Sequence, residues 1–557
     1  MPLPVRTHYP TAAALGVIAA LACALYLPFL GNPPVFDDRG FYSGHQLSDY
    51  ASSPLGLGLR YPAYFSLAFV EVSWGRIEAH RLVGLALHIA CGWALFALIR
   101  QLYEGTLLPC AAAAWFVMHP VGVYAAGYLI QRSIVMSTLF GLLSILVYVR
   151  GLRQGSYPLA VGAALLYSLA VLTKEHAVLV ALAAAAAAPL CGAARRFALR
   201  YTALYFTACM PAAMFVALLV KGYVVTPYES QFEAVTAEVM AARGGEAVAS
   251  PWLGSALTQA AMFFRYVALW LVPTTSRMAI DLKVDFASTW SPAVALPAVL
   301  GFAAWGAAGG YLLLRRGRAA IAGFGLLYTW TVFLVEFTVV RYQEPFVLYR
   351  SYLWAPGLAL LLVALAGSLP RTAVAVLVGA AAAVLPAQSY DRLGSFASGT
   401  ALWEDAVAKL PPAVPGGART LYLLGREYLY TDQPSKAVDV VERCIALYPA
   451  SAHCQFARAA IHMQFEQYEA AIPYLIRAIT LEPKGGAARH HLGLVLENLG
   501  CVEEAKAQYR ISAQLGFVGG AYRLMRLEKP GSGLLAPVEK KRGPCTAAIR
   551  SAALPPG

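Results

Sequence analysis

The chain has 557 residues, of which 59% are hydrophobic and 13% are charged, and its mean hydropathy is +0.58. This composition is too apolar for an ordinary soluble domain and indicates a membrane protein. The net charge of +13 comes largely from lysines and arginines in short loops between apolar runs. That distribution is typical of cytoplasmic loops and argues against nucleic acid as a partner.

Eleven apolar segments predict a polytopic, all-α membrane domain within residues 1–390. The first segment carries no charge, and because many more runs follow, it is interpreted as a retained span rather than a cleaved signal. A further run at 256–273 is interrupted by Arg265 and is predicted to be an interfacial or re-entrant helix. The predicted spans are 11–31, 80–100, 107–127, 132–150, 157–173, 177–192, 201–220, 293–314, 319–340, 352–369 and 372–388.

The positions of the arginines predict the orientation of these spans. The loops that carry Arg100, Arg150, Arg195 and Arg315 fall on one side, together with the N-terminus, and this side is predicted to be cytoplasmic. The opposite side is therefore predicted to face outward. The segments predicted to lie on this outer side are 32–79, 174–176, 222–292, 341–351 and everything after about 389.

The first outward segment contains two adjacent aspartates in "PPVFDDRGFYSG". A carboxylate held just beyond a span can act as general base on a hydroxyl, so Asp37 and Asp38 are the candidate catalytic residues. Arg39 is a candidate to orient one of them. No obligatory metal is predicted, and a divalent cation bound by Asp37 and Asp38 remains an alternative, since further oxygen ligands are not identifiable.

Three other outward clusters supply candidate substrate-binding residues. The short turn "LTKEHAVL" places charges between two predicted spans, close to the membrane. Charges there are costly and usually face a cavity or one another. Arginine presents a planar fork of donors suited to phosphate oxygens, which favours Arg132 and Arg350 as phosphate ligands. The full set is His119, Tyr124 and Arg132 from one cluster, Lys174, Glu175 and His176 from the second, and Arg341, Arg350 and Tyr352 from the third.

The C-terminal part has a different composition and a period of 34 residues. After a linker at 391–417, small residues recur in three units at about 418–451, 452–485 and 486–519, which is the pattern of tetratricopeptide repeats and predicts an α-solenoid. Residues 520–557 are predicted to be a basic, disordered tail. The nine cysteines include no CxxC pair, and they predict neither a metal site nor a disulfide framework.

The ordered set of motifs resembles the bacterial relatives of the transmembrane and tetratricopeptide-repeat O-mannosyltransferases, within the GT-C superfamily. The motifs are "FDDRGFYSG", "LRYPAYFSLAF", "HPVGVYAAGYLIQRS", "LVYVRG", "LTKEHAVL", "YRSYLWAP" and "SGTALWEDAVAKLPP". The resemblance implies an inverting glycosyltransferase of a bacterial inner membrane that takes a sugar from a polyprenyl phosphate or pyrophosphate carrier at the outer face. The outer segments and the repeats would then lie in the periplasm. Asp37 or Asp38 matches the acidic motif of the family's first outer loop. Tyr124 stands where related sequences often carry a polar or acidic residue, which puts the identity of the sugar in question.

The expected acceptor is a Ser or Thr hydroxyl of a protein held by the repeats, with membrane lipid around the spans. A lipid or surface glycan is the alternative acceptor. A non-catalytic membrane-anchored scaffold is the alternative of a different class, and the outer charge clusters argue against it. A transporter is disfavoured because no internal duplication is evident.

Overall fold

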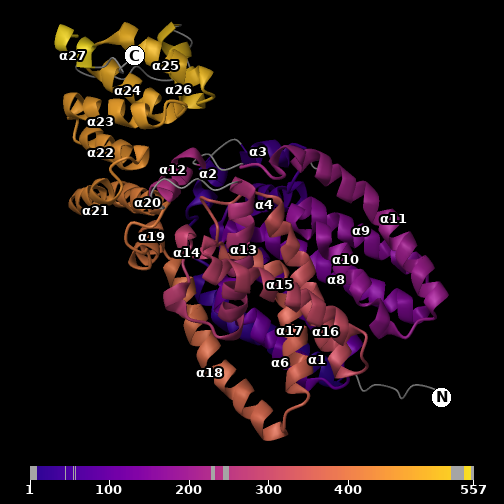
Figure 1. The fold of residues 1–557 in the computed structure, drawn as a ribbon. Coiled ribbons are helices and arrows are strands. Elements are labelled where there is room, and N and C mark those ends of the chain that lie inside the picture. The colour runs from indigo at the N-terminus through magenta and orange to yellow at the C-terminus, as the bar shows by residue number, and fades with distance from the viewer. Residues whose placement is uncertain are drawn as a thin grey trace. The chain divides into compact units, whose positions relative to one another are not determined.

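The computed structural model describes residues 9–43, 46–53, 56, 58–227, 232–242, 250–528 and 545–552. Among these residues all regular structure is helical, apart from two isolated β-bridges (Figure 1). The chain forms two units: a membrane unit of residues 1–232 and 243–405, and a repeat unit of residues 233–242 and 406–557. The expected all-α class is therefore confirmed.

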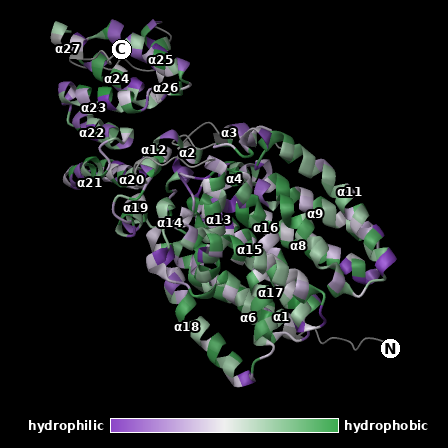
Figure 2. Cartoon of the chain, viewed as in Figure 1, coloured by the Kyte–Doolittle hydropathy of each residue, from purple (hydrophilic) through white to green (hydrophobic). Residues whose placement is uncertain are grey.

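Among the described residues, seven helical segments are long and apolar enough to cross a membrane, or eight if a bent pair counts as one span. Figure 2 shows the helices of the membrane unit as mainly hydrophobic. Three of the eleven predicted spans are helices of only 10–17 residues, which at about 1.5 Å per residue are too short for a bilayer core of about 30 Å. Eleven full-length spans are therefore not found in the described part of the chain, although each predicted segment is an apolar helix.

The seven segments are Thr11–Phe29, Ile77–Leu102 (α5), Leu129–Gln154, Arg195–Tyr223, Pro292–Leu313 (α15), Arg318–Thr338 and Arg371–Ser395 (α18). The bent pair consists of α6 (Leu107–Val117) and α7 (Pro120–Ala126), which meet at 62°. The shorter helices are α9 (Pro158–Thr173), Glu175–Ala186 and α17 (Ala355–Ala366). The first segment overlaps α1 (Tyr9–Tyr26). The other segments contain η2 (Leu129–Gln131), α8 (Arg132–Gln154), η3 (Glu175–Leu179), α10 (Val180–Ala186), α11 (Arg195–Val220), α16 (Arg318–Phe333) and η7 (Leu334–Thr338).

The bend between α6 and α7 has a local cause. Pro120 occupies the first turn of α7, and a residue that precedes proline is disfavoured in the helical region. His119 is accordingly extended, with φ −79° and ψ 131°, and the chain changes direction there.

Helix α13 (Pro251–Leu271) corresponds to the predicted interfacial run and is not among the candidate spans. One face of it is buried, and that face holds the segment 341–351 in place. Gln259 Nε2 donates to Pro345 O at 2.8 Å, and the Tyr266 hydroxyl is bonded to both the N–H and the carbonyl of Val347. Because this segment carries the predicted arginine cluster, α13 positions candidate site residues.

The repeat unit contains three helix pairs in the predicted register. The pairs are α20 (Gly417–Tyr430) with α21 (Pro434–Leu447), α22 (Ala452–Gln464) with α23 (Tyr468–Leu481), and α24 (Gly486–Asn498) with α25 (Val502–Gln514). Helix α12 (Phe232–Ala242) from the long loop before α13 belongs to this unit apart from its first residue. Glu238 Oε2 accepts a hydrogen bond from the Gly416 N–H at 2.7 Å.

Parts of the predicted linker and tail are helical. Helix α19 (Gly399–Ala408) lies in the predicted linker, while α26 (Val518–Glu528) and α27 (Ala547–Ala552) overlap the predicted tail. Ile549 of α27 is 8% exposed and belongs to a core cluster with Leu475 and Ile479. The basic run of the tail lies in 529–544, outside the described residues.

The prediction that the cysteines form no disulfide framework is wrong. Cys444 pairs with Cys454, and Cys501 pairs with Cys545, with Cα atoms 5.5 and 4.9 Å apart, which is within the usual range. Both bonds lie in the repeat unit, whereas the five cysteines of the membrane unit are free thiols. The sequence spacing alone did not reveal the pairs, because antiparallel helix packing and the return of α27 bring them together.

The Cys501–Cys545 bond should stabilise the repeat unit. It closes a segment of 44 residues and ties α27 to the core cluster, so the double variant Cys501→Ser/Cys545→Ser should lower the free energy of unfolding by about 3 kcal/mol. Proteolysis of the full-length protein in increasing urea, followed at cleavage sites in the repeats, measures this change. A variant with Cys23→Ser is the control, because that thiol is free, and equal stability of both variants would contradict the prediction.

Candidate functional site

The two predicted catalytic aspartates begin the short helix α2 (Asp37–Ser43) and have different surroundings. Asp37 is exposed, and its backbone N–H donates to the Tyr128 hydroxyl at 3.1 Å. Asp38 is fully buried. Carboxylates in the first turn of a helix are favoured by its exposed N–H groups.

The Asp38 carboxylate is anchored by backbone donors. Its Oδ1 accepts from the Ile130 N–H at 2.8 Å, and its Oδ2 accepts from the Val35 N–H at 3.3 Å. Burial raises the pKa of Asp38 to about 7, although these N–H groups and the nearby Arg81 guanidinium oppose the rise. The side chain thus fixes α2 against η2, and Asp37 is left as the accessible carboxylate.

The segment η2 also connects the aspartates to the predicted cationic cluster. Ile130 of η2 binds Asp38, and the next residue, Gln131, accepts a hydrogen bond from Lys174 Nζ at 3.5 Å. Tyr128 lies within electrostatic reach of Asp37, Asp38 and Tyr349. Two sequence-distant candidate clusters therefore both contact η2.

Lys174 is the unusual member of this site. It lies between α9 and η3, is 3% exposed, and places its ammonium 5.5 Å from the centre of the Tyr349 ring. Within the described part of the chain it forms no ion pair. Burial lowers the pKa of Lys174 to about 7, and the positive charges of Arg60, Arg350 and Arg341 add to this effect against the opposing charge of Glu175.

The neighbouring Glu175 is held by an arginine that the sequence did not single out. Arg60 Nε donates to Glu175 Oε2 at 3.1 Å, and its Nη2 approaches Oε1 at 2.5 Å, so the pair is bidentate. The His176 ring also approaches Glu175, at 3.4 Å. Glu175 is therefore committed to local pairing and does not neutralise Lys174 directly.

Glu336 lies at the centre of the remaining charges. Its carboxylate is 2.9 Å from Arg341 Nε, 3.7 Å from Arg350 Nη1 and 3.6 Å from His176 Nε2. Arg350 has Glu344 as a second partner at 3.7 Å and donates to the Glu344 carbonyl at 3.1 Å. The arrangement holds two guanidinium groups in fixed positions beside Lys174.

The segment that carries the two arginines is also held by a buried pair. Lys283 Nζ lies 2.7 Å from Asp281 Oδ1 and donates to the Gln343 carbonyl at 3.0 Å. A β-bridge between Leu282 and Phe346 extends this contact. The loop before α15 thus fixes the backbone between the two arginines.

The other five predicted residues do not contact the cluster of Lys174, Glu336 and the two arginines, although Arg132 lies within electrostatic reach of Asp38. His119 stacks on Trp270 at 4.2 Å and caps α7, while the Tyr352 hydroxyl is bonded to His88 at 2.6 Å within the core. The Tyr124 hydroxyl accepts from Arg392 at 3.5 Å. Arg132 donates to the carbonyls of Ser66 and His80 at 3.1 and 2.8 Å, and Arg39 donates to the carbonyl of Pro34 at 3.4 Å.

Four site residues were missed: Arg60, Tyr128, Glu336 and Tyr349. Glu336 is an acid inside an apolar run predicted to span the membrane. A carboxylate is costly to place there, so its presence could have identified Glu336 as a site residue. Arg60 and the two tyrosines stand within the quoted motifs but have no distinguishing spacing. Their roles follow only from the fold.

The donor set does not favour a metal ion at the aspartates. Both Asp38 oxygens already accept N–H hydrogen bonds, and hard cations need several oxygen ligands. In the described part of the chain, the three side chains whose ligand atoms lie near enough to one another to hold a metal ion are Cys501, Glu504 and Cys545. The two cysteines are joined in a disulfide and are not available as ligands. A divalent cation at Asp37 and Asp38 stays the alternative prediction.

Comparison with known protein families identifies tetratricopeptide repeats at residues 418–451 and 452–484. This confirms the predicted repeats and their boundaries for the first two units. A comparison with the curated proteins finds none that matches the chain. Repeats of this kind mediate protein–protein contacts, so the repeat unit supports a protein partner.

Removal of the central carboxylate should destabilise the membrane unit. Glu336→Gln would leave Arg341 and Arg350 buried with less compensation, and we expect a loss of about 3 kcal/mol in the free energy of unfolding. Glu344→Gln is the matched control, because that side chain is more exposed, and should cost less than about 1 kcal/mol. Chemical unfolding of both variants in detergent, compared with wild type, measures the difference; equal losses would mean that Glu336 does not organise the cluster.

Proposed function

We propose that the protein is an inverting glycosyltransferase that moves a sugar from a polyprenyl phosphate or pyrophosphate carrier to a Ser or Thr hydroxyl of a protein. The observation that carries this proposal is that η2 contacts both candidate clusters. Its Ile130 N–H binds Asp38, the buried neighbour of the exposed Asp37, and its Gln131 side chain binds Lys174, a buried lysine that forms no ion pair in the described residues. A base and an anion-binding cation at one place are what sugar transfer from a phosphate carrier requires. The family resemblance of the motifs supports the same activity.

The cationic side of the site would receive the leaving group. Lys174, with Arg350 and Arg341 beside it, offers positive charge where the phosphate becomes more negative as the glycosidic bond breaks. Since Arg341 and Arg350 already share Glu336, their charge is partly compensated. Lys174 would therefore contribute most to the stabilisation of the leaving phosphate.

Asp37 would act as the general base. It accepts the proton of the attacking hydroxyl while the hydroxyl oxygen forms a bond to the anomeric carbon. The bond between that carbon and the phosphate oxygen breaks, and its electron pair leaves with the lipid phosphate. A single displacement inverts the anomeric configuration. Asp38 is a positioning residue, because its carboxylate fixes α2 against η2.

The repeat unit would hold the protein acceptor. A cavity of about 390 Å³ lies along the first helices of the three pairs and is lined by Tyr422, Arg426, Phe456, His491 and Phe517 among others. Tyr422 and Phe456 are separated by one repeat of 34 residues and lie with their ring centres 6.2 Å apart. Aromatic rings along a concave helical surface suit an extended polypeptide.

The disulfides support the proposed orientation. Structural disulfides persist in oxidising compartments such as the periplasm, and both bonds lie in the repeat unit. This agrees with the placement inferred from the basic loops, in which the repeats and the site face the periplasm of a bacterium. The N-terminus would then be cytoplasmic.

Asp37→Asn should abolish most sugar transfer without a change in folding. Loss of a general base typically lowers the rate by about 10²–10⁴-fold. Asp49→Asn is the matched control, because Asp49 is an exposed aspartate on the nearby helix α3 (Gln46–Ala51). Intact-mass analysis of secreted proteins from cells that carry each variant measures the transfer.

Removal of the repeats after residue 405 should eliminate the same sugar masses if the acceptor is a protein. Unchanged protein masses in all variants would contradict a protein acceptor. A change in lipid-linked or surface glycans that depends on Asp37 would then indicate the alternative acceptor, and no change in either would favour the scaffold.

The pH dependence should report the charge on Lys174. Since burial lowers its pKa to about 7, the charged fraction decreases as the pH rises above that value, and kcat/KM should fall. Lys174→Arg keeps the positive charge at high pH, so its kcat/KM should lack this decline. Purified enzyme with a polyprenyl-phosphate sugar and an acceptor peptide provides the measurement, and an identical decline in both proteins would exclude Lys174 as its cause.

A further inference from the structure

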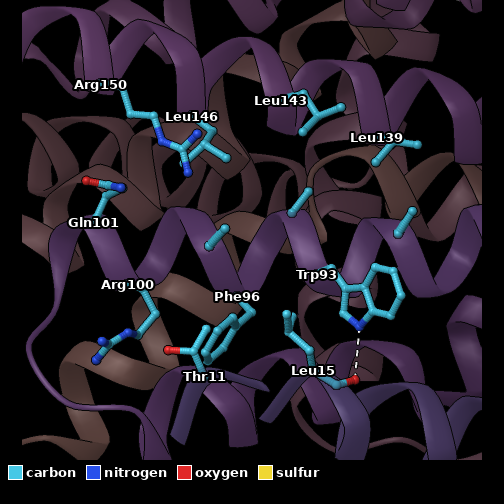
Figure 3. A pocket seen from close by; sticks show the side chains of 13 residues that line it. Thr11, Leu15, Trp93, Phe96, Arg100, Gln101, Leu139, Leu143, Leu146 and Arg150 are labelled. Carbon is cyan, nitrogen blue, oxygen red and sulfur yellow. Dashed lines mark hydrogen bonds between the residues drawn. The ribbon is translucent and has the colours of Figure 1, made fainter. Parts of the chain in front are cut away.

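A second site lies in the membrane unit, among α1, α5 and α8. A cavity of about 520 Å³ opens there, which is in the usual range for small-molecule pockets (Figure 3). Its walls are apolar and include Leu15, Trp93, Phe96, Leu139, Leu143 and Leu146. Trp93 Nε1 donates to the Leu15 carbonyl at 3.0 Å and joins α1 to α5 beside the cavity.

One end of the cavity is polar and positively charged. Figure 3 shows Arg100, Gln101 and Arg150 together at this end, away from Trp93 and Leu139. Arg153, one turn beyond Arg150, donates to Gln101 Oε1 at 3.4 Å. The described residues that line the cavity include no acidic side chain, so they do not neutralise the positive charge at this end.

The two arginines are available to a ligand to different degrees. Arg150 is exposed and has no hydrogen bond or ion pair in the described part of the chain. Arg100 donates to the Gly105 carbonyl from one of its terminal nitrogens. A guanidinium has five N–H donors, so Arg100 retains donors for a second partner.

Interfacial arginines commonly extend toward water and lipid phosphates, but this orientation does not explain the apolar cavity beside them. From Leu139 to Arg150 the lining follows α8 over roughly 16 Å at about 1.5 Å per residue. Trp93, in the wall, is 41% exposed on the surface that the bilayer would cover. A ligand with a long apolar chain and an anionic head matches this arrangement.

We propose that this cavity binds an anionic phospholipid of the surrounding bilayer, with an acyl chain between α5 and α8 and its phosphate between Arg100 and Arg150. The absence of an acid in the lining favours a lipid with net negative charge over a zwitterionic one. The bound lipid joins α1, α5 and α8 at the end that the basic loops place in the cytoplasm.

This lipid is separate from the proposed sugar carrier. Asp38 is bound at Ile130, just before the first turn of α8, whereas Arg150 lies in its last turns. The 18 residues from Arg132 to Arg150 correspond to roughly 27 Å along the helix. The lipid would thus stabilise the domain without entering the transfer reaction.

The test uses full-length protein reconstituted in phosphatidylcholine vesicles that contain a minor fraction of phosphatidylglycerol. After solubilisation, native mass spectrometry counts the phosphatidylglycerol that remains bound. Arg100→Gln/Arg150→Gln should weaken retention on the order of tenfold, as expected for the loss of charge-assisted hydrogen bonds to phosphate. Ala97→Trp should also reduce retention, because Ala97 lines the cavity and the new ring would fill it with no change in charge.

Arg200→Gln is the matched control, because Arg200 is an exposed arginine on the same predicted side and does not line the cavity. A photoreactive phosphatidylglycerol should label peptides of α5 and α8 in wild type and in this control only. Thermal unfolding checks that each variant is folded. Equal retention by all variants, equal retention of phosphatidylcholine, or displacement of the bound lipid by equimolar polyprenyl phosphate would each overturn the proposal.

Discussion

Charge buried without water must be paired, and this constraint organises the candidate site. An unpaired ion in an apolar interior costs several kcal/mol, so the arginines of the segment 341–351 share the carboxylate of Glu336, and Arg350 also pairs with Glu344. Arg60 and Glu175 form their own bidentate pair. Lys174 is left with an amide and an aromatic ring as neighbours. A buried lysine without an ion pair does not stabilise the fold, whereas a phosphate ligand would provide the missing counter-charge.

The sequence predicted the part of the site where charged residues stand between two apolar spans, because burying a charge there costs free energy. Lys174, Glu175 and His176 occupy a turn too short to need charges, and that alone indicated a functional cluster. His119, Tyr124 and Tyr352 stand in equally suggestive motifs, yet their side chains turn toward Trp270, Arg392 and His88. Motif spacing does not determine which way a side chain points, so these assignments required the structure.

The fold shows the same division between periodic and non-periodic features. A period of 34 residues specified the repeat boundaries, because helix packing in each unit needs small residues at fixed places. Hydropathy located every apolar helix but not its length, since short buried helices such as α17 are as apolar as a span. The disulfide between Cys501 and Cys545 depends on the return of α27 to the repeats, and no local pattern encodes that return.

The adjacent aspartates can have different roles because they are neighbours on a helix. Successive residues of an α-helix point about 100° apart, so one carboxylate can be buried while the next faces outward. Phe36, immediately before them, has a φ of 51°, a strained value for a residue with a side chain, and its ring packs against Tyr128 and Trp403. That packing and the hydrogen bond from Ile130 to Asp38 hold the turn in place. The accessible orientation of Asp37 is therefore maintained by Asp38 and Phe36, which explains why the chain has two aspartates where the proposed chemistry uses one.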